Sequence, residues 1–128
     1  MAHVADSETD AADPAEAAAT FRLAQDAWAA AGRPERPRLV TGSFVVLGPD
    51  AQDRLVTFAR RYLDVFGTEL AELLADAMPL HTDDALHRFL TELTTTGCDE
   101  VVLVPGDSDP DQVRRIAEVV TSVDLGAA

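Results

Sequence analysis

The stretch DEVVLVPGDSDPDQVRRIAEVV, residues 99–120, decides the fold of this chain. Four consecutive apolar residues, 101–104, end in a Pro-Gly step and an acidic turn, which is typical of a strand that closes at a loop. A helix is predicted to follow, with Asp109 as its N-cap, Pro110 at its first position and Gln112 three residues after the cap. The stretch therefore predicts one strand–loop–helix unit.

The strand of this unit shows no alternation of polar and apolar residues. We therefore expect both of its faces to be covered, as in a parallel sheet flanked by helices. One other strand of this kind is predicted over residues 39–47, and it closes at Gly48 and Pro49. Because roughly 50 residues of helix separate the two strands, they are expected to pair in parallel through a crossover. Sheets usually contain about 4–6 strands, so two strands predict an incomplete sheet whose neighbours this polypeptide does not encode.

The other segments predict helices from their caps, stops and apolar spacing. The first runs from the cap Asp13 to about Ala31, the second from the cap Asp50 to the stop Gly67, the third from Glu69 to about Ala77, and the fourth from a cap at Thr82 or Asp83 to the stop Gly97. The predicted buried side contains Leu55, Phe58, Ala59, Tyr62 and Phe66 in the second helix and Leu86, Phe89, Leu90 and Leu93 in the fourth. The predicted order is α-β-α-α-α-β-α. Residues 1–12 are predicted to be a disordered tail, and residues 13–128 a helix-rich α/β domain with two parallel strands.

The charge of the chain limits its expected partners. Its 128 residues fit one domain, and 23 acidic against 10 basic residues give a formal net charge of −13. Such a surface repels phosphate backbones and anionic lipid headgroups, so neither nucleic acid nor a membrane is expected as a partner. No apolar run approaches the length of a membrane span, and the N-terminus lacks the pattern of a secretory signal. The chain is therefore predicted to be cytoplasmic.

Two apparent ligand sites near the last predicted helix have plainer interpretations. The spacing from Asp107 to Glu118 superficially resembles a calcium loop, but that loop needs glycine at its sixth position, where this chain has Gln112. Asp107 and Asp109 would oppose a phosphate at the helix N-terminus. The histidines are too scattered to predict a metal site, and these are His3, His81 and His87.

The remaining candidate residues predict structural roles. Cys98 is the only cysteine, so it forms no internal disulfide, and it is interpreted as a buried structural thiol. Trp28 is interpreted as a core residue. A solvated loop is favoured over an anion site for the arginines of the proline-rich connector, which are Arg33, Arg36 and Arg38. Nothing in this pattern assembles a catalytic site.

Four segments together resemble one known family. They are FRLAQDAW at 21–28, AGRPERPRLV at 31–40, CDEVVLVP at 98–105 and DPDQ at 109–112. In this order they resemble the carboxy-terminal part of luciferase-like monooxygenases, which are flavin- or deazaflavin-dependent oxidoreductases on a TIM-barrel scaffold. The resemblance covers residues 17–121, nearly the whole chain.

The resemblance implies a partial TIM barrel made of the last β/α units, with FMN or a deazaflavin coenzyme at the carboxyl-terminal mouth in the parent family. It also implies a cofactor rim at the mouth positions that this chain retains, which are Gly48, Pro105, Gly106 and Asp107. No family catalytic motif appears, so no catalytic residue is carried over. A barrel needs eight strands and about 250 residues, so we expect this segment to be inactive alone and to bind no cofactor tightly.

Two other functions remain open. The chain is alternatively a non-catalytic α/β interaction module that forms a homo-oligomer or completes its sheet with a complementing chain, because unpaired strand edges are templates for association. A third hypothesis is a self-contained small domain. Additional strands within residues 1–12 or 68–82 would favour it. A strand face open to water would count against a barrel remnant.

Overall fold

A computed structural model describes residues 13–76 and 78–124 of the chain. Its elements in order are α1 (Pro14–Ala30), β1 (Val40–Val45), α2 (Ala51–Leu63), the 3-10 turn η2 (Asp64–Phe66), α3 (Thr68–Asp76), α4 (Asp83–Leu93), β2 (Glu100–Pro105) and α5 (Asp111–Ser122). The predicted α/β class, the order of helices and strands and the two parallel strands are confirmed. The predicted tail over 1–12 and the predicted helix end at Ala77 lie outside the described residues.

Three of the predicted cap residues accept hydrogen bonds at the starts of their helices. The Asp13 side chain accepts a hydrogen bond from the backbone N–H of Ala15, at the start of α1. Thr82 accepts one from Ala85 at the start of α4. Asp109 accepts one from the backbone N–H of Asp111, but α5 begins at Asp111 with Pro110 as its N-cap residue, so the predicted helix start lies one residue too early. These bonds satisfy donors that a helix start otherwise leaves unpaired.

The predicted cap at Asp50 is wrong in its mechanism. Asp50 precedes α2, but its side chain makes no capping hydrogen bond. Its backbone is left-handed, with φ of 56°, a conformation that aspartate tolerates better than most residues. The sharp turn after β1 therefore sets the start of α2. The helix also ends earlier than Gly67, at Leu63, because η2 tightens the last turn.

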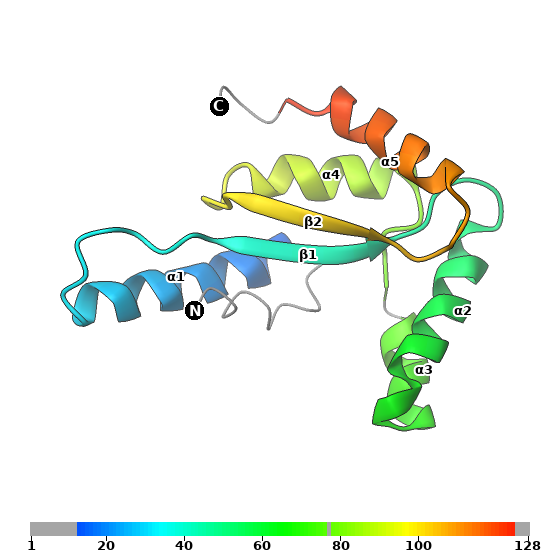
Figure 1. The fold of residues 1–128 in the computed structure, drawn as a ribbon, viewed down its shortest axis with the longest axis horizontal. Helices are drawn as coiled ribbons and strands as arrows, with labels where there is room; N and C mark the ends of the chain where they lie inside the picture. Colours follow the sequence, from blue (N-terminus) through cyan, green and yellow to red (C-terminus); the bar gives the residue numbers. More distant parts are fainter. Residues whose placement is uncertain (1–12, 77, 125–128) are drawn as a thin grey trace.

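The sheet consists of β1 and β2, paired in parallel from Val40↔Glu100 to Val45↔Pro105. Both strands run in the same direction, so their carboxyl ends share one edge of the sheet, and α2 and α3 stand beside this edge (Figure 1). Each strand pairs with one neighbour within the described residues. In the described part of residues 68–82 the chain forms α3 and no additional strand.

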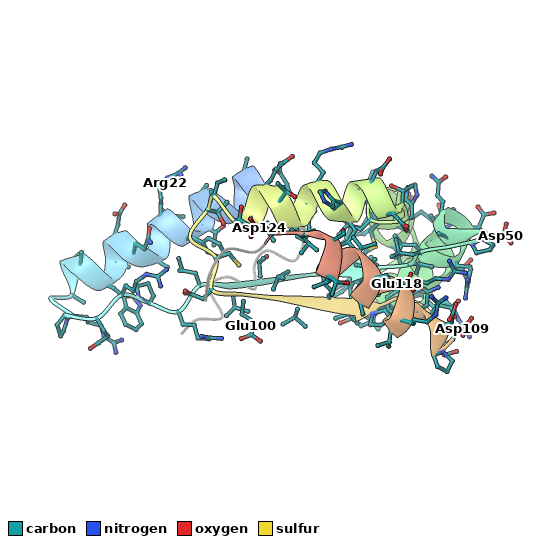
Figure 2. The ribbon with its side chains drawn as sticks, turned by 90° about the horizontal axis from the view of Figure 1, so that it is seen from above. Arg22, Asp50, Glu100, Asp109, Glu118 and Asp124 are labelled. Atoms are coloured by element: carbon teal, nitrogen blue, oxygen red, sulfur yellow. The ribbon has the colours of Figure 1, made fainter. Side chains whose placement is uncertain are left out.

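The main core lies between the sheet and three helices. Figure 2 shows α1 and α4 on the same side of the two strands, and α5 contributes to the same buried cluster. That cluster contains Ala17 and Phe21 of α1, Leu86, Phe89, Leu90 and Leu93 of α4, Ile116 and Val119 of α5, and Leu39, Val45 and Leu47 in and around β1. All four residues predicted to form the buried side of α4 are buried there.

The opposite face of β2 is uncovered, which corrects the prediction that both strand faces are buried. Glu100, Val102 and Val104 are exposed, with Val102 at 46% and Val104 at 38% of full exposure. The alternate residues Val101 and Leu103 pack against the helix core. An unbroken valine-rich run therefore satisfies the β-propensity of the strand while only one face has a helix layer. β2 behaves as a half-buried strand whose sequence lacks the usual polar alternation.

Other residues predicted to be part of the core are only partly buried or are exposed. Trp28 is only half-buried, and the guanidinium carbon of Arg33 lies 3.7 Å from the centroid of its ring. The second half of α1 runs past the ends of the strands, so it has no sheet to pack on (Figure 1). Tyr62 and Phe66, predicted on the buried side of the second helix, are exposed, whereas Leu55 and Ala59 are buried as predicted. Among the described residues no helix has the length and apolar character needed to span a membrane.

Candidate functional site

The loops that follow the two strands meet at the carboxyl edge of the sheet. The backbone N–H of Gly106 donates to the carbonyl of Val45 at 2.9 Å, which ties the loop after β2 to the end of β1. The predicted rim residues Gly48, Pro105, Gly106 and Asp107 therefore lie at one edge, as parallel pairing requires. This edge is the part of the molecule where a ligand of a parallel α/β sheet is expected.

Gly106 is buried beneath α2. A Cβ atom at this position would lie 3.0 Å from Cγ2 of Val46, 3.2 Å from Cδ1 of Leu55 and 3.3 Å from Cδ2 of Phe58. These distances are shorter than ordinary carbon–carbon contacts. Glycine is therefore used here for close packing of the loop against α2. Its surroundings are filled by side chains of this chain.

Asp107 belongs to an ion pair that joins the loop after β2 to α2. Its Oδ2 accepts a hydrogen bond from Nε of Arg54 at 2.7 Å, and its Oδ1 accepts one from the backbone N–H of Asp109 at 2.8 Å. The Arg54 bond is the main reason that the pKa of the Asp107 carboxyl lies below its ordinary value. Arg54 also approaches Asp109, with 3.8 Å between the guanidinium and the carboxylate. The charge of Arg54 is thus already neutralised.

Gly48 lies under a second arginine. Its φ is +93°, and a Cβ there would lie 2.9–3.0 Å from the guanidinium of Arg115. Nε of Arg115 donates to Asp111 at 3.0 Å, and Asp111 also accepts from Arg114 at 2.7 Å. These bonds, that of Arg114 first, lower the pKa of Asp111. A phosphate at this edge would have to displace carboxylates from the arginines it needs.

Gln112 is the residue of this edge whose role the sequence did not predict. Its side chain is buried, and its Oε1 accepts from the backbone N–H of Leu47 at 2.9 Å while its Nε2 donates to the Leu47 carbonyl at 2.8 Å. The amide therefore continues the hydrogen bonding of β1 beyond the end of β2 and fastens α5 to it. The available signal was an uncharged polar residue at position 112, in line with the buried positions Ile116 and Val119 of the same helix.

The arginines of the connector are exposed, as predicted for a solvated loop, and each is paired with a carboxylate. Arg36 donates through one nitrogen to both carboxylate oxygens of Asp99 and through the other to the carbonyl of Gly97. Arg38 pairs with Glu100 at 2.5 Å. The side chains stay exposed, but each pair ties the connector to the start of β2. Both ion pairs lie at the amino ends of the strands.

The other predicted candidates contribute no chemical site within the described residues. Cys98 is half-buried and contacts backbone carbonyls, and burial raises the pKa of its thiol, as for a structural cysteine. His81 is half-buried and His87 exposed, while His3 lies outside the described residues. Residues 13–76 and 78–124 contain no group of three His, Cys, Asp or Glu side chains placed to hold a metal ion.

Comparison of the chain with known protein families, with curated proteins and with solved structures finds no match. The resemblance to luciferase-like monooxygenases therefore stays a prediction. What the geometry defines is an α/β fold with a closed network of ion pairs at the carboxyl edge and an open apolar face on β2.

The Arg54–Asp107 pair gives a testable pH dependence. We expect Arg54→Met to raise the pKa of Asp107 toward its ordinary value of about 4, because the main cause of the lowered pKa is removed. A carboxyl with a lowered folded-state pKa stabilises the protein above its unfolded pKa, and this contribution is lost as the pH falls through the folded value. The stability difference between the two proteins should therefore be largest near neutral pH and narrow below about pH 4.

NMR titration of the aspartate carboxyl carbons measures the pKa directly. Arg88→Met serves as the matched control, because Arg88 lies exposed on α4, away from this edge. An unchanged Asp107 pKa in Arg54→Met would contradict the assigned pair.

Proposed function

We propose that this chain is a non-catalytic α/β interaction module that binds a second polypeptide through the open face of its sheet. The observation that carries the proposal is the uncovered face of β2, where Val102 and Val104 are exposed although the helix core covers the other side of the same strand. Association with a second polypeptide would remove these two valine side chains from water.

The energetics of a two-stranded sheet support this proposal. Sheets usually contain more strands, and α1, α4 and α5 cover one face of this strand pair. Burial of apolar surface contributes roughly 25 cal/mol per Å², so covering this face adds stability that the chain does not obtain by itself. The ion pairs at the carboxyl edge also support the proposal of a non-catalytic module. They join elements of the chain to one another and hold the edge closed.

Light scattering combined with thermal unfolding of the purified chain tests the proposal. We expect either an assembly heavier than the 13.7 kDa monomer, or a monomer that unfolds without cooperativity because its sheet is incomplete. A strictly monomeric chain that unfolds in one cooperative transition would show that the sheet needs no completion. That result would overturn the proposal.

A second candidate function is supported by one feature of the layout. Helices α1, α4 and α5 pack on one side of two parallel strands, and the loops after both strands share one edge, as in the wall of a β/α barrel. We propose on this basis that the strands derive from the last β/α units of a luciferase-like oxidoreductase. A barrel remnant is expected to have both strand faces covered. The open face of β2 therefore counts against this candidate, which ranks second.

The rim positions do not fit a flavin in this chain. Gly48 lies under the guanidinium of Arg115, and the space around Gly106 is filled by Val46, Leu55 and Phe58. We therefore expect titration with FMN, or with a deazaflavin coenzyme, to leave the fluorescence of the cofactor unchanged. Tight binding together with turnover by the isolated chain would contradict this expectation and restore the oxidoreductase to first place.

A further inference from the structure

We propose that the polypeptide that covers the open face of the sheet is a second copy of this chain, packed face to face. This inference rests on the proposed function and names its partner. The face is formed by Val102 and Val104 of β2 together with their register partners Gly42 and Phe44 of β1. Gly42 carries no side chain that could shield Val102. The patch is therefore apolar, and α2 covers it only at Phe44, at the carboxyl end of the strands.

The distribution of charge is the first reason for a second copy. The chain carries a formal net charge of −13, so two copies repel each other across most of their surfaces. β1 has no charged residue, and the single charge of β2, Glu100, is paired with Arg38. Figure 2 shows Glu100 on the side of the strands away from α4. The open face is thus locally neutral, and two copies can meet there without an unpaired carboxylate.

The shape of the apolar surface at the carboxyl end is the second reason. Phe44 continues the face into an aromatic group with Phe58 and Tyr62 of α2, with ring centroids 4.9 and 5.2 Å from that of Phe44. Tyr62 is itself exposed. Aromatic side chains of this kind are enriched in the centres of interfaces, and a twofold contact uses the same residues on both copies. A single apolar strip along the strands satisfies that requirement.

The hairpin of α2 and α3 is the competing apolar surface. Its exposed residues are Val65, Phe66, Leu70, Leu73 and Leu74. The exposed carboxylates Asp64, Glu69 and Glu72 border them and outnumber the basic residues Arg60 and Arg61 in the last turn of α2. A second copy docked there would bring like charges together, which opposes association. The open face of the sheet is therefore the surface that a second copy fits.

Sedimentation equilibrium of the full chain and of matched variants tests the inference. We expect the chain to form a dimer of twice 13.7 kDa, and Val102→Asp to raise its dissociation constant about 10-fold or more. Val113→Asp is the control, because Val113 is 63% exposed on α5 and the substitution adds the same charge. Val104→Asp should repeat the effect of Val102→Asp, and far-UV circular dichroism shows that each variant is folded.

The outcomes separate this inference from the proposed function. Loss of the dimer in Val102→Asp but not in Val113→Asp supports both. A dimer that survives Val102→Asp but is lost in Leu73→Asp overturns the face-to-face contact and assigns assembly to the helical hairpin. A monomer that unfolds without cooperativity overturns the second copy and leaves a different partner chain. A cooperative monomer overturns both proposals.

Discussion

Replacement of Gln112 by leucine is expected to lower the free energy of unfolding by about 2–4 kcal/mol. The substitution keeps the size of the side chain but removes both hydrogen bonds to Leu47, at 2.9 and 2.8 Å. Leu47 is fully buried, so its backbone N–H and carbonyl lose their partner where water does not replace it. Each unsatisfied buried group costs about 1–3 kcal/mol, and two groups are affected here.

Chemical denaturation of the variant measures this loss. Gln52→Leu is the matched control, because Gln52 lies exposed on α2 and the same substitution there should change stability by less than about 0.5 kcal/mol. Equal effects of the two substitutions would show that the Gln112 amide does not hold β1 and α5 together. Gln112→Glu should also destabilise the protein, since a carboxylate cannot donate to the Leu47 carbonyl.

Gln112 also shows where prediction from the sequence reaches its limit. Its position three residues after Asp109 predicted a helix start, and α5 begins at Asp111, whose backbone N–H donates to Asp109. Its side chain bonds to a residue 65 positions away in the sequence, and local spacing carries no information about such a partner. Caps, stops and helical faces were predictable because they depend on residues within one or two turns.

The strands show the same limit in a different form. Their existence and parallel pairing followed from an apolar run and a long helical crossover. Whether their faces are covered depends on where the helices pack. A valine-rich sequence is compatible with a strand that has one buried face and with a strand that has two. The sequence therefore could not distinguish the exposed Val102 from the half-buried Leu103.

The sequence predicted where the loops of the candidate site lie but not which contacts their residues make. Gly48 and Gly106 were correctly placed at the carboxyl edge because loops after parallel strands share that edge. The ion pair of Arg54 with Asp107 joins residues that are 53 positions apart, so no local sequence motif predicts it. The sequence consequently predicts an open rim at this edge. In the structure, packed side chains and ion pairs occupy it.

Gly106→Val is expected to lower the free energy of unfolding by about 2–3 kcal/mol. A Cβ at this position already falls 3.0–3.3 Å from Val46, Leu55 and Phe58, and the two methyl groups of valine would push further into the same space. The backbone of Gly106 is not among those with positive φ, so the substitution adds no left-handed strain. The loss therefore reports overpacking between the loop and α2.

Ser108→Val separates packing from the general effect of a branched residue in this loop. Ser108 is exposed two positions further on, so the same side chain should change stability by no more than about 0.5 kcal/mol. Gly106→Ala should fall between the two, since it adds only the Cβ. If Gly106→Val proved as stable as the parent chain, the carboxyl edge would have to contain space beside Gly106. A ligand at this rim would then become feasible, because the objection that the rim is already filled would be gone.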